Sequence, residues 1–95
     1  MADYRLSNAA KEDFIGIYHY GVEKFGILQA DKYFDSLFKY FDLISQQPYA
    51  FESIEYIQRG YRLCACDAHS IYYGIKKNIV EIMAIVGSQD LKNAL

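Results

Sequence analysis

The chain of 95 residues has room for one domain of roughly 100 residues and is too short for two hydrophobic cores. Hydrophobic residues make up 53% of it, with ten Tyr and six Phe, which excludes disorder as the main state. A net charge of -2 disfavours nucleic-acid binding across a broad face, and no apolar run approaches the ~20 residues of a membrane span. We therefore expect a soluble chain with no membrane partner and no direct sequence-specific nucleic-acid binding.

The N-terminal half predicts a strand followed by two helices. Apolar and polar residues alternate over residues 3–6, which is the period-two pattern of a strand. Hydrophobic residues then recur at helical spacing over residues 9–25 and again over residues 28–47. Gly26 and Pro48 stand where these helices should end. Because so short a connection forces neighbouring helices to run antiparallel, we expect a helical hairpin.

The C-terminal half has the pattern of a sheet. Short aromatic and β-branched runs, separated by turn residues, lie at residues 54–57, 61–66, 70–75 and 79–86. We predict an α+β fold in which the N-terminal strand and the antiparallel helical hairpin pack on a small antiparallel β-sheet, as a single domain over residues 1–95. The polar tail, residues 87–95, offers one partial helical turn.

Charge is divided unevenly between the two halves. Residues 1–55 carry five Lys or Arg against nine Asp or Glu, whereas residues 56–95 carry five against three. We expect any contact with an anionic partner to involve the second half.

A cluster of Cys64, Cys66, Asp67 and His69 is the strongest hint of metal chemistry. A structural zinc site normally needs two separated ligand pairs, and the remaining histidine, His19, lies on the first helix. On a strand the two cysteines share a face about 7 Å apart, too far for an unstrained disulfide. We therefore expect buried thiols in a cytoplasmic protein, with no metal and no cofactor.

The residues also carry a resemblance to a known family. The stretches that carry it are Tyr4 to Asp13, the apolar positions from Phe25 to Pro48, Ile57 to Arg62 with His69 to Tyr73, and Val80 to Asp90. Their order and spacing resemble the ParE branch of the RelE/ParE superfamily, the toxins of type II toxin-antitoxin modules.

The resemblance implies a non-enzymatic toxin that inhibits DNA gyrase and is silenced by direct binding of a cognate, ParD-like antitoxin. It implies no catalytic residues and no cofactor. The residues expected to contact the target are Arg59, Arg62, Ser88, Gln89, Asp90 and Leu91. Those expected to contact the antitoxin are Tyr18, Phe38, Tyr40 and Tyr72.

The last strand departs from the family pattern. Many members lead into a His-Gly-Arg or similar basic turn, where this chain has Val86 and Ser88 around Gly87. Two alternatives therefore stay open. One is a RelE-like, ribosome-dependent mRNA endoribonuclease in which Arg62, His69 and Tyr72 would act on the phosphodiester; the other is a non-toxic relic that only binds an antitoxin.

Overall fold

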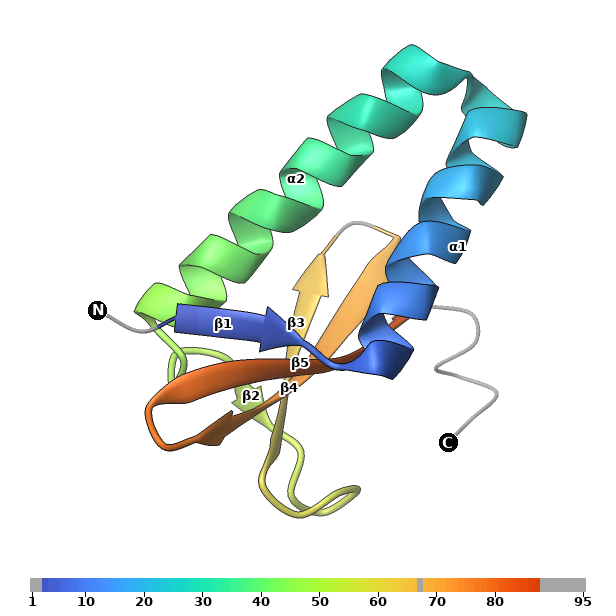
Figure 1. Ribbon diagram of the computed structural model, residues 1–95. Coiled ribbons are helices and arrows are strands. Elements are labelled where there is room, and N and C mark those ends of the chain that lie inside the picture. Colours follow the sequence, from blue (N-terminus) through green and yellow to red (C-terminus); the bar gives the residue numbers. More distant parts are fainter. Residues whose placement is uncertain (1–2, 67, 88–95) are drawn as a thin grey trace.

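The computed structural model describes residues 3–66 and 68–87, and it has two helices packed on one side of a five-stranded sheet. Figure 1 shows the helices as a hairpin whose closed end points away from the strands. The elements in chain order are β1 (Asp3–Leu6), α1 (Asn8–Phe25), α2 (Ile27–Gln46), β2 (Glu52–Ser53), β3 (Tyr61–Cys66), β4 (His69–Lys76) and β5 (Ile79–Gly87). The expected α+β architecture is confirmed.

The helices begin and end for reasons visible in the sequence. Ser7 caps α1, because its side-chain oxygen accepts a 3.0 Å hydrogen bond from the N–H of Ala10. Gly26 alone separates the two helices and has a φ of +89°, which a residue with a Cβ rarely adopts. The one-residue connection confirms the predicted hairpin.

The sheet order is β1-β5-β4-β3-β2, and the pairing of β1 differs from the expected one. β1 runs parallel to β5, with Tyr4 opposite Val80, while the other strands pair antiparallel. The sheet is therefore mixed rather than purely antiparallel. Alternation of residues over a strand indicates which face is buried, but it carries no signal for the partner or the direction of pairing.

The predicted edge strand at residues 54–57 is wrong. The edge strand is β2, two residues earlier, and residues 54–57 enter a turn in which the carbonyl of Ile54 accepts from the N–H groups of Ile57 and Gln58. Ile54 is 1% exposed. Its hydrophobicity reflects a side chain that anchors a turn in the protein interior rather than one face of a strand.

The hydrophobic core lies between the hairpin and the sheet. α2 and β5 contribute most of its bulk, and the parallel edge strand adds a ring contact between Tyr4 and Phe41 at 5.5 Å. Its buried members are Ala10, Phe14, Leu37, Phe41, Ile44, Cys64, Cys66, Ile71, Tyr73, Val80, Ile82 and Ile85. The expectation that both cysteines are buried is confirmed.

Within the described part of the chain, no helix is both long enough and apolar enough to cross a bilayer.

A β-bulge interrupts β5. Tyr72 pairs with Ala84 and Tyr73 pairs with Ile82, which leaves Met83 as an extra residue on β5. Residues from the start of α1 satisfy the backbone groups around the bulge. Ser7 donates from its hydroxyl to the carbonyl of Met83 at 3.0 Å, and its N–H donates to the carbonyl of Ile82 at 2.9 Å.

Candidate functional site

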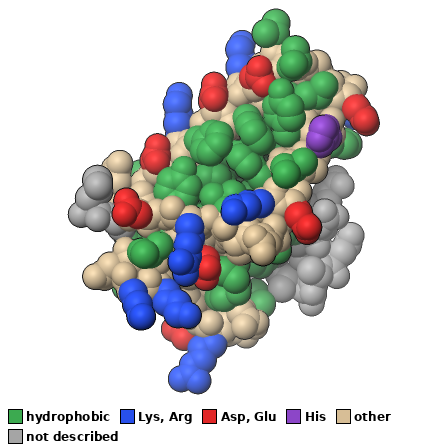
Figure 2. All heavy atoms as spheres, in the orientation of Figure 1, with side chains coloured by type: hydrophobic (Ala, Val, Ile, Leu, Met, Phe, Trp, Pro, Cys, Tyr) green, Lys and Arg blue, Asp and Glu red, His purple; other side chains and the backbone are tan. Residues whose placement is uncertain are grey.

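Aromatic side chains form a surface along the hairpin, which we call the hairpin aromatic surface: Tyr18, Phe34 and Phe38, the last two in ring contact with the buried core residue Phe14. Phe14 stacks on Phe34 with ring centroids 3.8 Å apart, and Phe38 meets Phe14 edge-on at 5.1 Å. Phe38 remains 40% exposed. Figure 2 shows hydrophobic side chains gathered over α1 and α2, with charged side chains around them. Exposed aromatic rings with a charged margin are typical of a protein-binding surface.

Tyr18 fixes one side of this surface. Its hydroxyl donates a 2.8 Å hydrogen bond to the Asp31 carboxylate on the other helix, and that bond raises the pKa of the Tyr18 phenol. The ring of Tyr18 also packs against Phe34 at 4.7 Å. The hairpin therefore presents Tyr18 in one orientation, which reduces the entropy lost when a partner binds.

The four residues expected to contact an antitoxin do not share one surface. Tyr18 and Phe38 belong to the hairpin aromatic surface, whereas Tyr40 is half-buried and packs against the core. Tyr72 lies on β4 beside the core residue Tyr73, and neighbouring strand residues point to opposite faces. Tyr72 therefore faces away from the helices.

The two arginines expected to contact a target have different environments. Arg62 donates to the carbonyl of Phe51 at 2.6 Å and to that of Tyr49 at 3.4 Å, and its guanidinium lies 5.1 Å from the centre of the Tyr49 ring. It therefore holds the loop that follows α2. Arg59 is exposed in the turn before β3. The other expected target contacts, Ser88, Gln89, Asp90 and Leu91, lie outside the described residues.

Tyr73 supports the same loop from beneath. Its buried hydroxyl donates a 2.6 Å hydrogen bond to the carbonyl of Pro48. Burial raises the pKa of Tyr73 to about 12 and outweighs the opposing effect of the nearby Arg62 charge. Sequence reasoning missed this role, because a tyrosine in an aromatic strand gives no sign of a backbone partner 25 residues away.

The three residues of the ribonuclease alternative are not brought together. Arg62 pairs with Tyr73 at one end of the β3–β4 ladder, whereas His69 pairs with Cys66 at the other end. Four residues of strand place these ends about 13 Å apart. Tyr72 faces the opposite side of the sheet. General acid–base catalysis needs its groups within hydrogen-bond reach of one reacting centre, and this arrangement does not provide it.

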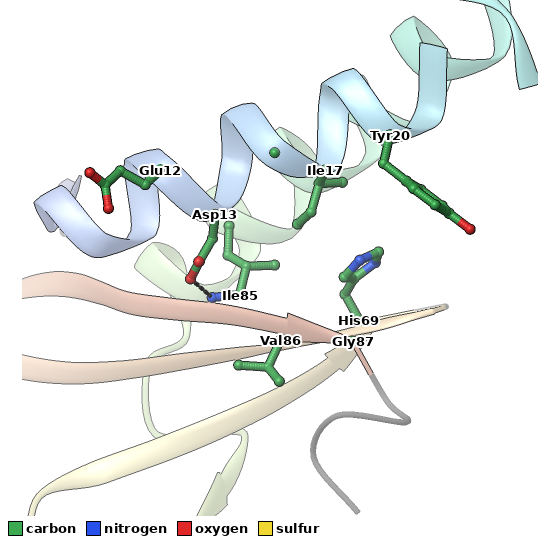
Figure 3. Close-up of a pocket in the computed structure, with 9 residues that line it drawn as sticks. Glu12, Asp13, Ile17, Tyr20, His69, Ile85, Val86 and Gly87 are labelled. Atoms are coloured by element: carbon green, nitrogen blue, oxygen red, sulfur yellow. Dashed lines mark hydrogen bonds between the residues drawn. The ribbon is translucent and has the colours of Figure 1, made fainter. Parts of the chain in front are cut away.

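A groove of about 510 Å³ lies between α1 and the ends of β4 and β5, and we call it the α1–β5 groove. Figure 3 shows side chains from the helix and from the strand ends facing one another across it. Asp13 crosses the gap and accepts a 3.1 Å hydrogen bond from the N–H of Ile85. The lining residues are Glu12, Asp13, Gly16, Ile17, Tyr20, His69, Ile85, Val86 and Gly87.

A second cavity of about 400 Å³ continues from this groove beneath the closed half of the hairpin. The two share Ile17, Tyr20 and His69. At their junction the hydroxyl of Tyr33 and Nδ1 of His69 form a 2.5 Å hydrogen bond. His69 therefore ties the start of β4 to α2. No group of three or more potential metal ligands is found among the described residues.

Comparisons with known proteins place the chain in a family. A family model described as the ParE toxin of the type II toxin-antitoxin system, parDE, matches residues 4–91. The chain belongs to the ParE toxin family. Toxin ParE1 of Caulobacter vibrioides is 32% identical over 85 residues, which span 87% of this chain and 88% of that toxin.

A solved structure shares the fold of this ParE-type toxin. A chain from the chromosomal ParDE toxin-antitoxin system of P. aeruginosa superposes with a TM-score of 0.80, covering 92% of this chain and 96% of that one. Sequence identity is only 18%, so this likeness supports the architecture alone. The two helices on a mixed sheet are thus the ParE fold, and the predicted family is confirmed.

Proposed function

We propose that this ParE-type toxin inhibits DNA gyrase without catalysing a reaction of its own, and that a cognate ParD-like antitoxin silences it by direct binding. The family match over residues 4–91 carries the proposal, because it runs from within β1 to beyond the end of β5 and so covers both helices and the sheet except Asp3. The separation of Arg62, His69 and Tyr72 supports a non-enzymatic mode of action over the ribonuclease alternative.

The hairpin aromatic surface is the part of the molecule best suited to an antitoxin. A segment that folds on binding gains affinity by burying aromatic side chains, and Phe38 offers one that is 40% exposed. The similar chain from P. aeruginosa comes from a ParDE toxin-antitoxin system, which supports an antitoxin as the partner here. We assign the antitoxin-binding role to Tyr18 and Phe38 before Tyr40 and Tyr72.

The target side of the molecule is proposed to be the C-terminal end of β5 together with the residues after it. Ser88 to Leu91 are the candidate contacts there. The exposed Arg59 would be a separate contact, because it precedes Tyr61, which lies beside Gly74 and Glu81 at the other end of the sheet from Gly87. Arg62 is a poorer candidate, because its guanidinium already holds the loop after α2. We therefore expect substitutions at Arg59 and at Arg62 to act through different mechanisms.

Purified gyrase tests the proposal directly. The toxin should inhibit supercoiling of relaxed plasmid, and an equimolar antitoxin should relieve the inhibition. A translation extract with intact mRNA serves as the counter-assay. Cleaved mRNA with unaffected supercoiling would establish the ribonuclease alternative, and harmless overexpression with neither effect would establish the relic.

Removing residues 88–95 should abolish inhibition of supercoiling while leaving antitoxin binding in place. Inhibition that survives this truncation would exclude the tail as the effector.

A further inference from the structure

The α1–β5 groove contains a glycine that packing within the fold does not explain. A Cβ built on Gly21 would lie 3.4 Å from the Cβ of Ala30, so close helix packing explains that glycine. A Cβ built on Gly16 would meet nothing within 4 Å. Glycine disfavours a helix relative to alanine, and no contact within the described structure requires it at Gly16. Because Gly16 lines the groove and carries no side chain, we infer that a partner molecule approaches the backbone of α1 at this position.

The groove is held in shape before any partner arrives. The hydrogen bond from the N–H of Ile85 to Asp13 and the two bonds from Ser7 to the bulge fix the start of α1 against β5. Both walls are therefore set by contacts inside the fold. A preformed groove spares a ligand the cost of ordering it, which favours use as a binding site.

The lining also indicates the chemistry of an occupant. Glu12 and Asp13 line one end: the Asp13 carboxylate accepts from the Ile85 N–H, the Glu12 carboxylate points away from β5 (Figure 3), and the described lining residues include no Lys or Arg. Ile17 on α1 and Ile85 on β5 contribute apolar side chains to the lining, whereas the side chain of Val86 points away from the helix (Figure 3). A segment that places a cationic side chain on the carboxylates and a bulky apolar side chain over Gly16 would satisfy both regions.

The groove is continuous with the proposed target side of the toxin. Gly87 forms part of its lining, and the proposed effector residues begin immediately after it. We propose that the α1–β5 groove is a docking site for the toxin's protein target, which inserts a bulky apolar side chain over Gly16 next to a cationic one. The inference rests on the proposed function, in which that target is gyrase, and it adds a second contact region to the tail.

Substitution at Gly16 separates binding from folding. Gly16→Ala and Gly16→Leu should fold at least as stably as the wild type, because each improves helix propensity and a Cβ there meets no atom within 4 Å. Gly16→Leu should nevertheless raise the toxin concentration for half-maximal inhibition of supercoiling about tenfold or more, with a smaller rise for Gly16→Ala. Affinity for the antitoxin should not change.

His19→Ala is the matched control. It also improves the helix propensity of α1, but His19 is exposed and is not among the groove residues. It should leave inhibition unchanged. Glu12→Lys reverses the charge at the acidic end and should weaken inhibition in a salt-dependent manner, which a purely steric effect would not produce.

The outcomes separate the two levels of the proposal. If the wild-type toxin inhibits gyrase and Gly16→Leu inhibits it equally, the docking site is wrong and the proposed function stands. If Gly16→Leu instead loses antitoxin binding, the groove belongs to the antitoxin and the inference is overturned. If the wild-type toxin fails to inhibit gyrase, the proposed function falls and the inference falls with it.

Discussion

Asp13, on the first helix, accepts a 3.1 Å hydrogen bond from the backbone N–H of Ile85, although 72 residues separate them in the chain. The bond exists because the bulge at Met83 shifts the ladder of β5 and leaves that N–H directed toward α1. Together with the contacts of Ser7, it joins the N-terminal part of the fold to the last described strand. The strength of this junction can be measured through the stability of variants.

Asp13→Ala should lower the free energy of unfolding by about 1–3 kcal/mol, because the partly buried N–H of Ile85 loses its acceptor. Asp13→Asn keeps an acceptor oxygen in the same place and should recover most of the loss. Urea denaturation of both variants tests this. An Asp13→Ala protein as stable as the wild type would mean that solvent satisfies the amide equally well.

Tyr73→Phe should cost about 1 kcal/mol, since it removes the hydrogen bond from the buried hydroxyl to the carbonyl of Pro48 and keeps the ring. Tyr56→Phe is the control, because that exposed hydroxyl makes only a 3.5 Å contact with Glu52. Thermal unfolding should distinguish them. Equal melting temperatures for the two variants would contradict the anchoring role of Tyr73.

Stability should fall at alkaline pH. Burial raises the pKa of Cys64 from 9.0 to about 11 and that of Tyr73 from 10.0 to about 12, so the folded protein keeps protons that the unfolded chain releases. The stabilising effect is complete below pH 9 and is lost as the pH rises through these folded values, with a slope of at most about 1.4 kcal/mol per pH unit for each proton.

Unfolding by urea at several pH values between about 8 and about 10.5 measures this slope. Cys64→Ala should make it shallower, because one of the two retained protons is absent. A slope that is unchanged in Cys64→Ala would show that the buried thiol does not contribute to the alkaline loss of stability.

Lys77→Gly should stabilise the protein by a few tenths to about 1 kcal/mol. Lys77 and Asn78 form the turn between β4 and β5 with φ values of 52° and 65°, where glycine avoids the steric cost of a side chain. Lys77→Val should be destabilising, because a branched Cβ is poorly tolerated there. Lys76→Gly, within β4, should not stabilise, and an equal gain from it would point to charge rather than backbone conformation.

Arg59→Ala and Arg62→Ala should separate recognition from structure. Arg62→Ala removes the contacts with the loop after α2 and should lower the melting temperature by several degrees, as expected for a loss of about 1–2 kcal/mol. Arg59→Ala should leave the melting temperature unchanged and weaken gyrase inhibition. The reverse pattern would assign target recognition to Arg62 and exclude it for Arg59.

The helical hairpin could be predicted well from the sequence and the sheet less completely. Apolar spacing placed both helices within one residue of their observed bounds, because a 3.6-residue repeat leaves a long signal in the chain. The same reasoning misplaced the edge strand, since the buried Ile54 belongs to a turn. The parallel direction of β1 is set by long-range packing and has no local signature.

The α1–β5 groove could not be predicted from the sequence either, because it too depends on contacts between residues far apart in the chain. It joins residues near position 13 to residues near position 85, and no spacing rule connects them. From the sequence, Gly16 is only a residue that disfavours a helix, and its place in the groove lining follows from the fold. Arg62 was expected to contact a target, whereas in the fold it binds carbonyl groups of the loop after α2 that a side-chain pattern does not reveal.

The extra residue at Met83 determines which face of the sheet each later residue of β5 points to. In an uninterrupted strand, Ile82 and Ile85 would face opposite ways; the bulge allows both to reach the interior. Deleting Met83 itself would restore a regular ladder in which Ile82 and Ile85 still face the interior, whereas one inserted residue would invert every side chain from there to Gly87. Insertion of one residue between Ile82 and Ile85 should therefore destabilise the fold far more than deletion of Met83, because only the insertion turns the buried Ile85 out of the interior.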